Sequence, residues 1–364
     1  MKLAIVFGTR PEIIKLSQII SLAEINPSIS PILIHTGQHY SSNMSDFFLD
    51  QLQLPKPDFN LEIGSGTQAY QVGMGLIKLE EIFLREKPDM VIAQGDTNAV
   101  FSAALAATNL HIPFSHVEAG IRSFDRKMPE EINRILSDQI SEYCFAPTEI
   151  AVKNLINEGI SNNKIYLTGN TIVEATNRNM DVAKRSDILD RLNLEMEEYI
   201  VVTAHRAENV DNKERLLSLI RIFEHITEPI VYPIHPRTLK NINNFGFLDR
   251  INSIDNLNLI DPLGYLDFLK LCANSKLIIS DSGGIQEEVT IYKKPILVIR
   301  DSTERPEILD KFGWLVGCDQ RRTIERYEYI INNYAEIKKK LQNLDSPFGD
   351  GEASKTIIYQ MGQL

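Results

Sequence analysis

Four acidic residues in the first half of the chain have the types and positions that proton transfer requires. Asp96 and Glu118 each follow a short apolar run, and Glu130 and Glu131 stand side by side a little further on. Carboxylates of this kind act as general acids and bases when a fold brings them together. Glu130 and Glu131 also have a purely structural explanation, because acidic residues commonly occupy the first turn of a helix, where Glu130 and Arg134 form an ordinary surface pair.

A second group of residues is suited to binding an anion. Asp281-Ser282-Gly283-Gly284 leads into a helix-like apolar stretch, and glycines at a helix N-terminus let a phosphate approach free backbone N–H groups. An exposed helix end favours an anion by only about 0.3–1 kcal/mol, so a diphosphate also needs cations. The cationic side chains available for this are Arg10, Lys15, Arg206 and Arg305. The glycine motif alone fits a tight strand-to-helix turn equally well.

Two histidines follow apolar runs in the second half of the chain. His205 precedes Arg206, and His235 precedes a proline. Each either caps the element that follows or donates a hydrogen bond to a phosphate or sugar. His39 and His116 show no partner in the sequence and are assigned structural roles.

Short apolar runs alternate with amphipathic stretches, which predicts strands and helices in alternation. In the first half, strands are predicted at 3–7, 32–35, 90–93, 114–117, 144–146 and 165–167, with helices at 12–24, 45–52, 68–86, 99–109, 131–141 and 149–157. In the second half, strands are predicted at 199–203, 230–234, 257–260, 277–280 and 296–299, with helices at 213–225, 266–273, 285–292 and 353–361. This order implies parallel sheets covered on both faces, and two such sets imply two doubly wound α/β domains.

Polar clusters lie at the predicted carboxyl ends of these strands, where open parallel sheets bind ligands. They occur at 8–11, 36–39, 94–97 and 118–120, and again at 204–206, 235–237, 261–262 and 281–284. Capping and turn formation explain any single cluster, but not the recurrence of His, Arg and Gln throughout the set. We therefore expect the two sheets to face each other across one cleft that collects the clusters.

Composition narrows the class of protein. The 364 residues carry a net charge of −11, which argues against general nucleic-acid binding but allows a local basic patch for a small anion. Cys144, Cys272 and Cys318 are scattered and show no metal-ligand spacing, as in a reduced cytoplasmic protein. The apolar N-terminus is interrupted at Gly8, too early for a signal peptide, and no apolar run is long enough for a membrane span. We expect a cytoplasmic protein without a bound metal.

Taken together, these motifs resemble the non-hydrolysing UDP-N-acetylglucosamine 2-epimerase family. The matching segments run in order along nearly the whole chain: 7–12 with Lys15, 95–97, 116–120, 129–134, 168–171, 203–206, 281–288, 303–307 and 347–351. The resemblance implies the glycosyltransferase-B fold of two facing Rossmann-like domains. In this fold a first domain at 1–168 is completed by a C-terminal helix at 349–364, and a UDP-binding domain occupies 169–348. The resemblance also implies interconversion of UDP-N-acetylglucosamine and UDP-N-acetylmannosamine with no cofactor, and it suggests a homodimer.

Motif matching assigns individual roles within this resemblance. The positions that match catalytic residues of the family are Asp96, Glu118, Glu130 and His205. The positions that match its substrate-binding residues are Arg10, Lys15, Arg134, His205, Leu263, Phe268, Ser282, Gly283, Gly284, Glu288 and Arg305. Phe268 falls beside the uracil, and Leu263 would act through its backbone. Gln38 and Gln68 lie near segments that bacterial members use for activation by substrate, but those segments diverge here and the property is not carried over.

Other activities fit parts of the same pattern. The segments 36–40 and 205–209 also resemble epimerases of UDP-2,3-diacetamido uronic acids, whereas 287–288 and 303–306 favour the N-acetylglucosamine enzymes. A hydrolysing epimerase, a retaining glycosyltransferase of the same fold and a non-catalytic UDP-sugar sensor are the remaining alternatives. The cluster of three acids argues against the sensor.

Overall fold

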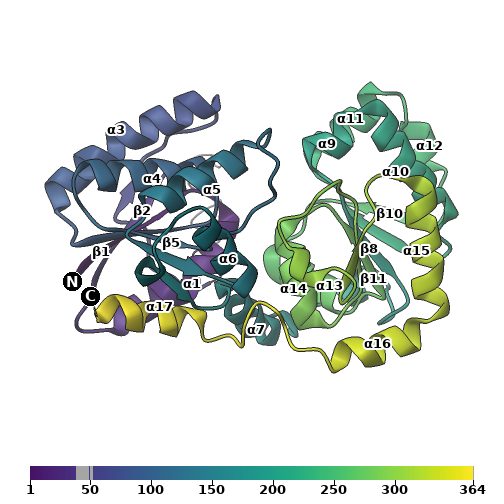
Figure 1. Ribbon diagram of the computed structural model, residues 1–364. Coiled ribbons are helices and arrows are strands. Elements are labelled where there is room, and N and C mark those ends of the chain that lie inside the picture. Colours follow the sequence, from purple (N-terminus) through teal and green to yellow (C-terminus); the bar gives the residue numbers. More distant parts are fainter. Residues whose placement is uncertain (38–48, 50–51, 364) are drawn as a thin grey trace. The chain divides into compact units, whose positions relative to one another are not determined.

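The computed structural model describes residues 1–37, 49 and 52–363, and these form two compact units (Figure 1). The first unit comprises Met1–Ala175 and Phe348–Leu364, and the second comprises Thr176–Pro347. The predicted helix at 45–52 lies almost wholly outside the described residues, as do Gln38 and His39. Among the described residues, no helix is both long and apolar enough to cross a membrane.

The first unit is built on a seven-stranded parallel sheet in the order β3-β2-β1-β4-β5-β6-β7. Its strands are β1 (Lys2–Phe7), β2 (Ser30–His35), β3 (Phe59–Asn60), β4 (Met90–Gln94), β5 (Phe114–Val117), β6 (Tyr143–Ala146) and β7 (Ile165–Leu167). Its helices are α1 (Arg10–Ile25), α3 (Gln68–Glu86), α4 (Asn98–Asn109), α5 (Pro129–Ile140), α6 (Glu149–Asn157), the short η1 (Asn162–Lys164) and α17 (Ala353–Gly362). Helix α7 (Thr171–Ala183) carries the chain from the first unit into the second.

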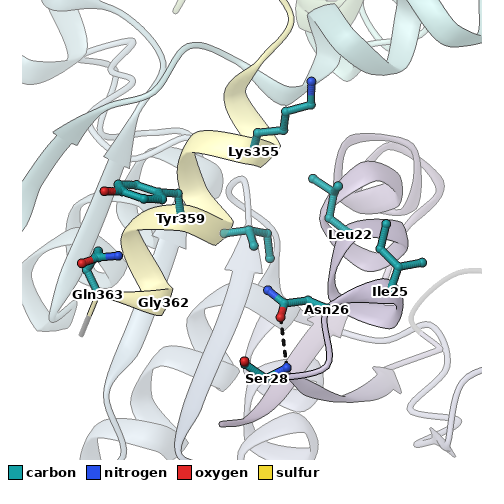
Figure 2. A pocket seen from close by; sticks show the side chains of 9 residues that line it. Leu22, Ile25, Asn26, Ser28, Lys355, Tyr359, Gly362 and Gln363 are labelled. Carbon is teal, nitrogen blue, oxygen red and sulfur yellow. Dashed lines mark hydrogen bonds between the residues drawn. The ribbon is translucent and has the colours of Figure 1, made fainter.

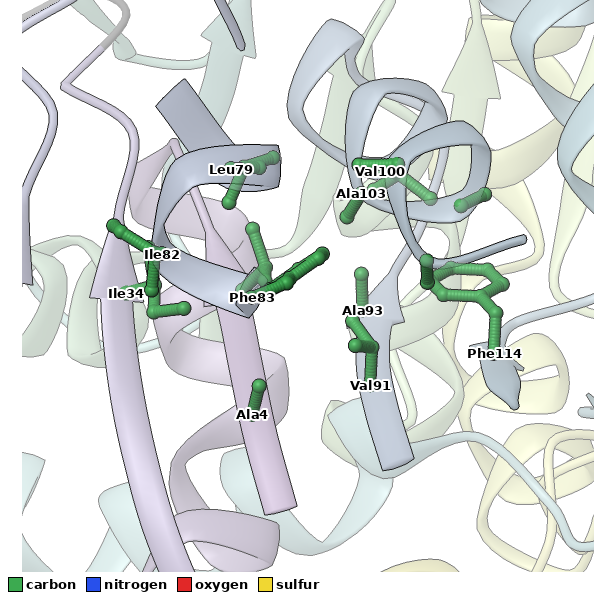
Figure 3. Packing of buried hydrophobic residues seen from close by; sticks show 14 of the residues in the cluster. Ala4, Ile34, Leu79, Ile82, Phe83, Val91, Ala93, Val100, Ala103 and Phe114 are labelled. Atoms are coloured by element: carbon green, nitrogen blue, oxygen red, sulfur yellow. The ribbon is translucent and has the colours of Figure 1, made fainter. Parts of the chain in front are cut away.

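Helices α3 and α4 cover one face of this sheet (Figures 1 and 3). Alternate residues of the strands, such as Ala4 and Val91, pack against Phe83 of α3 and Val100 of α4 in one buried cluster. The close approach of α4 requires a glycine at position 75 of α3, because a Cβ on Gly75 would lie 2.7 Å from Ser102 Oγ of α4. The two helices therefore pack closely only because this side chain is missing.

Helices α1 and α17 lie side by side within the first unit. The end of α1 and helix α17 form a surface hollow of about 490 Å³ (Figure 2). The hollow is lined by Leu22, Ile25, Asn26, Ser28, Lys355, Ile358, Tyr359, Gly362 and Gln363. None of these is a predicted site residue, so the hollow lies apart from the candidate site.

The second unit repeats the same plan with a six-stranded parallel sheet in the order β10-β9-β8-β11-β12-β13. Its strands are β8 (Ile200–Thr203), β9 (Ile230–Pro233), β10 (Leu257–Ile260), β11 (Leu277–Ser280), β12 (Ile296–Val298) and β13 (Gly313–Leu315). Its helices are α8 (Ile188–Arg191), α9 (Ala207–Val210), α10 (Lys213–His225), α11 (Pro236–Asn244), α12 (Leu248–Asn252), α13 (Tyr265–Ala273), α14 (Gly283–Tyr292), η2 (Pro306–Ile308), α15 (Gln320–Asn332) and α16 (Tyr334–Gln342).

The prediction of two doubly wound α/β units is confirmed, and each predicted strand is present. The sequence did not predict β3 and β13, which have two and three residues, nor helices α7, α8, α9, α11, α12, α15 and α16. Helix α15 was missed because it is mostly polar and buries only Thr323, Tyr327 and Ile330.

Candidate functional site

Asp96 and Glu118 lie at the same edge of the first sheet, as predicted. Strands β4 and β5 are parallel neighbours in which Ala93 pairs with His116 and Gln94 with Val117. The carboxyl ends of the two strands therefore coincide; Glu118 follows β5 directly, and Asp96 follows β4 after one glycine. Parallel sheets of this type carry their ligand sites at this edge.

The Glu118 carboxylate is buried and held by side chains from three other parts of the chain. Lys15 Nζ of α1 lies 2.6 Å from Oε1, and Asn170 Nδ2 donates to the same oxygen at 2.8 Å. Gln94 Nε2, from the end of β4, donates to Oε2. Glu118 also has a φ of +73°, a left-handed backbone that an L-residue adopts only under tertiary constraint. Since every one of these partners is a donor, the site favours the ionised carboxylate.

Asp96 is more accessible than Glu118, and an arginine fixes its orientation. Its side chain is 32% exposed, and Oδ2 lies 2.5 Å from Arg134 Nη2. Arg134 Nη1 lies 2.7 Å from Glu131, which in turn accepts the backbone N–H groups of Ser123 and Phe124 at 2.9 and 2.8 Å. Arg134 thus joins Asp96 to a buried acid that anchors the loop before α5. A partly exposed, oriented carboxylate of this kind can reach a ligand.

Glu130 and Arg10 lie at the starts of helices. Glu130 is exposed in the first turn of α5, next to the buried Glu131. Arg10 is the first residue of α1, where the neighbouring Glu12 accepts the N–H groups of Gly8 and Thr9 at 2.9 and 2.6 Å. Burial raises the pKa of Glu12 to about 7, although Thr97 Oγ1 and these N–H groups lower it. Glu12 therefore caps the start of α1, and it also joins the β1 and β4 loops through Thr97.

The buried His116, for which the sequence shows no partner, links several parts of this edge. His116 Nδ1 lies 2.6 Å from Asp138 Oδ1, and Nε2 lies 2.7 Å from the Gly95 carbonyl. Both neighbours accept hydrogen bonds, so the geometry suits a doubly protonated imidazolium. Burial lowers the pKa of His116, but the Asp138 charge and these two acceptors raise it by more, so the pKa lies above its ordinary value of 6.5. Only the adjacency of β5 and α5 in space reveals this pair.

Asp138 extends the same network toward Glu118. Its Oδ2 accepts the Gly120 N–H at 3.0 Å and lies 2.7 Å from Arg122 Nη2. Burial raises the pKa of Asp138, but His116 and Arg122 lower it by more, so it remains a carboxylate. Gly120 has a φ of +82°, and a Cβ there would lie 2.3 Å from the Ala151 carbonyl oxygen. One buried ion cluster therefore holds the backbone just before Asp96 and just after Glu118.

In the second unit, a buried aspartate organises the edge at β8 and β11. Asp281 Oδ2 accepts the backbone N–H groups of His205 and Arg206, both at 2.9 Å, and Asn209 Nδ2 at 3.0 Å. Its Oδ1 lies 3.2 Å from His205 Nδ1. Burial raises the pKa of Asp281, but His205 and these donors lower it by more. The pairing uses Nδ1 of His205, whose side chain is 44% exposed, so Nε2 is the nitrogen left for a ligand.

The start of α14 has the properties expected of an anion site. Ser282 is the N-cap residue, and its side chain makes no capping hydrogen bond. Gly283 and Gly284 form the first turn, and a Cβ at Gly283 would meet no atom within 4 Å. Further along α14, the Glu288 carboxylate accepts hydrogen bonds from Tyr265 and Tyr292 at 3.3 and 3.0 Å.

The remaining predicted residues of the second unit take varied positions. Arg305 is buried, with its guanidinium paired to Glu287. Leu263 and Phe268 are half-buried, in the loop before α13 and on α13 itself. His235 is the N-cap of α11, and its Nδ1 accepts the Arg237 N–H at 3.1 Å. Of the two explanations open for His235, the structure therefore supports capping.

Both strand orders follow the doubly wound Rossmann pattern, in which the first strand lies mid-sheet and the chain winds outward on either side. Two such units in one chain define a two-domain α/β protein of the glycosyltransferase-B type. Comparison with known proteins then narrows the class. The model of one family, described as UDP-N-acetylglucosamine 2-epimerase, matches residues 23–362.

Individual relatives agree with this match. The chain is 48% identical to a UDP-N-acetylglucosamine 2-epimerase of Methanocaldococcus jannaschii, over 98% of each chain. The crystal structure of the M. jannaschii enzyme in complex with UDP-GlcNAc and UDP superposes with a TM-score of 0.91 and covers both chains completely. A UDP-2,3-diacetamido-2,3-dideoxy-D-glucuronate 2-epimerase of Pseudomonas aeruginosa is 37% identical over the full length of both proteins. The chain belongs to the UDP-N-acetylglucosamine 2-epimerase family, and it is an isomerase.

The His116 cluster predicts a specific dependence of stability on pH. Because folding raises the pKa of His116, the stabilisation is complete below about 6.5 and is lost as the pH rises through the folded-state value. Replacing His116 with Gln breaks a buried ion pair, and we expect it to reduce the free energy of unfolding at pH 6 by about 3 kcal/mol or more. The difference between wild type and variant should shrink toward pH 9, as measured by urea unfolding across this range.

His225→Gln is the matched control, because His225 forms an exposed pair with Glu328. We expect this variant to differ little from wild type at any pH. A His116→Gln deficit that stays constant from pH 6 to pH 9 would show that His116 is not charged in the folded protein.

Proposed function

We propose that this enzyme interconverts UDP-N-acetylglucosamine and UDP-N-acetylmannosamine by inverting C2 of the sugar, without a cofactor. Membership of the family supports the substrate class. The observation that carries the proposal is the pair of carboxylates at the adjacent ends of β4 and β5, one buried with donors on both oxygens and one partly exposed. Two acids in such different surroundings suit a reaction that removes one proton and returns another.

The chemistry of the sugar dictates the route. C2 is not next to a carbonyl group, so its proton is too weakly acidic for direct removal. Breaking the C1–O bond puts positive charge on C1 and acidifies the C2 proton. The UDP oxygen leaves with the bonding electrons, a base takes the C2 proton, and a C1–C2 double bond forms to give a glycal. Proton addition to C2 from the other face and attack of UDP on C1 complete the inversion.

We assign the proton transfers and charge stabilisation to Asp96, Glu118 and Glu130. Glu118 acts as a carboxylate, because its partners Lys15, Gln94 and Asn170 all donate to it. Asp96 has the exposure to reach the sugar, and Glu130 is exposed at the start of α5. A positioned general base typically contributes about 10²–10⁴ to the rate.

We assign UDP binding mainly to residues of the second unit. The start of α14, with Ser282, Gly283 and Gly284 in its cap and first turn, suits the diphosphate. His205 Nε2 would contact the departing phosphate, and the Glu288 carboxylate is placed to accept from ligand hydroxyls. We further propose that Arg10, Lys15, Arg134 and Arg305 supply positive charge and that Leu263 and Phe268 contact the base. Preorganised donors of this kind stabilise the negative charge that develops on UDP.

The diacetamido-uronate epimerase is the second candidate, since a relative with that activity is 37% identical over the whole chain. It would use the same chemistry on a different sugar. The higher identity to an N-acetylglucosamine enzyme favours the first substrate. Assaying both UDP-sugars side by side distinguishes the two.

We also propose a cytoplasmic homodimer. All three cysteines are free thiols, which fits a reducing compartment. Tyr70, Ile77 and Leu84 of α3 are 49%, 52% and 58% exposed at intervals of seven residues, and therefore lie along one side of the helix. An apolar stripe of this kind suits association with a second copy, which sedimentation equilibrium tests directly.

Turnover in heavy water tests the reaction itself. Since the C2 proton is lost to a base and replaced from solvent, incubation with UDP-N-acetylglucosamine in D₂O should yield UDP-N-acetylmannosamine with deuterium at C2. Proton NMR follows both the product and the loss of the C2 signal. Retention of the original proton in the product would rule out the elimination route, and free N-acetylmannosamine would indicate a hydrolysing enzyme.

Replacing Asp96 with Asn tests the exposed acid. The amide keeps the size of the side chain but cannot transfer the proton, so kcat should fall by about 10²–10⁴ while the protein remains folded. Asp125→Asn is the matched control, because Asp125 lies in the same unit and only accepts a local N–H from Lys127 at 3.0 Å. Near-normal turnover in Asp96→Asn would remove Asp96 from the mechanism.

Replacing Gly283 with Ala tests the anion site at α14. The added methyl group meets no protein atom within 4 Å, so the fold should be retained. It would stand where the diphosphate approaches the backbone, and the loss of one hydrogen bond to a charged group weakens binding by roughly tenfold or more. Titration calorimetry with UDP measures this loss. Gly362→Ala in α17 has the same empty surroundings and should bind UDP normally.

A further inference from the structure

Asn170 connects the candidate acid Glu118 to the place where the chain leaves the first unit. It lies between β7 and α7 and is 1% exposed. Its Nδ2 donates to Glu118 Oε1 at 2.8 Å, and its Oδ1 accepts the Ile172 N–H at 3.0 Å. The second contact defines the orientation of the amide, because only the oxygen can accept. The NH₂ group must therefore point toward Glu118.

The backbone of Asn170 is fixed by the segment in which the chain returns to the first unit. Its N–H donates to the Phe348 carbonyl at 2.7 Å, and Phe348 is buried. Gly169 has a φ of +82°, and a Cβ there would lie 3.2 Å from the Phe348 oxygen, so the two backbones approach closely. Four residues after Asn170, Glu174 accepts the Ser354 N–H at 3.0 Å. These backbone contacts therefore fix the position of Asn170 independently of its side-chain contact with Glu118.

Glu118 depends on such donors because burial removes it from water. A buried carboxylate without hydrogen bonds is strongly disfavoured, whereas donors stabilise its charged form. Lys15 supplies charge to Oε1, but it sits on a long side chain with rotatable donors. Asn170 is shorter and held at its own oxygen, so it adds direction to the contact at Oε1.

We propose that Asn170 is a positioning residue for the reaction, which holds the Glu118 carboxylate ionised and in the orientation that catalysis requires. This inference rests on the proposed function, because it assumes that Glu118 takes part in the epimerisation. It goes further in assigning the orientation of the acid to a neutral residue anchored on the C-terminal return segment.

Asn170→Asp is the decisive variant. It keeps the size of the side chain, the contact with Ile172 N–H and the backbone hydrogen bond to Phe348. It removes the donor to Glu118 and places a second negative charge beside it, which raises the pKa of Glu118. We expect kcat to fall at least tenfold at neutral pH, KM for UDP-N-acetylglucosamine to stay within about threefold, and the acid limb of the kcat profile to move upward by about one pH unit or more.

Two further variants separate positioning from stability. Asn170→Ala lacks the added charge and should move the acid limb in the same direction by a smaller amount. Asn256→Asp is the matched control, because Asn256 Nδ2 donates to the Ile226 and Glu228 carbonyls at 2.8 Å, away from the candidate acids. This control should lose stability to urea but keep the wild-type kcat and pH profile.

The outcomes distinguish this inference from the proposed function. Wild-type turnover with C2 exchange in D₂O establishes the function before any variant is compared, and its absence would overturn that function alone. If wild type is active and both Asn170 variants lose only stability, with kcat and the acid limb unchanged, Asn170 is structural and the inference is wrong. A fall in kcat without a shift of the acid limb also contradicts it, since the ionisation of Glu118 would then not depend on Asn170.

Discussion

The buried charge of Glu118 is the constraint on which the first unit depends. A carboxylate that is 6% exposed can remain ionised only if donors replace the water that it has lost. Those donors come from α1, from the end of β4 and from the turn before α7. The sheet order β1-β4-β5 and the start of α7 must therefore all be correct before this one side chain is satisfied. A change in any of these elements would remove a donor from the buried Glu118 carboxylate.

A second buried network supports the backbone that carries the acids. His116 hydrogen-bonds the Gly95 carbonyl, just before Asp96 in the sequence. Asp138 accepts the Gly120 N–H, two residues after Glu118. One network thus orients a carboxylate, and the other holds the loops from which both acids project. Buried charges of this kind contribute little net stability compared with apolar packing, but breaking them is costly, which makes the geometry hard to distort.

The second unit uses a buried acid in the same structural way. Asp281 follows β11 and accepts hydrogen bonds from the backbone N–H groups of His205 and Arg206, which follow β8. It is the residue just before Ser282 and the N-terminus of α14, so a single carboxylate sets the positions of both the histidine and the proposed anion site. Asp281 and Glu131 therefore act as anchors, whereas Asp96 remains partly exposed.

Most of the strands and many of the helices can be predicted from the sequence, because the spacing of apolar residues depends only on neighbours along the chain. The sequence predicts the strands before Asp96 and Glu118 and the long helix at 68–86 close to their observed limits. It also predicts that the two acids lie close together. Helix α15 and strand β13 are not predicted, since a polar helix and a strand of three residues carry little periodic signal.

Sequence alone determined the two-unit α/β class and the family motifs, and it proposed the residues that transfer protons or bind an anion. Tertiary structure decided what each polar residue contacts. It paired His116 with Asp138, gave Lys15 and Asn170 to Glu118, made His235 a cap and left Asp96 partly exposed. The reason is physical: the charge and orientation of a buried polar group depend on partners that are distant in sequence, as Asn170 is from Glu118, and only the folded chain brings them within hydrogen-bond distance.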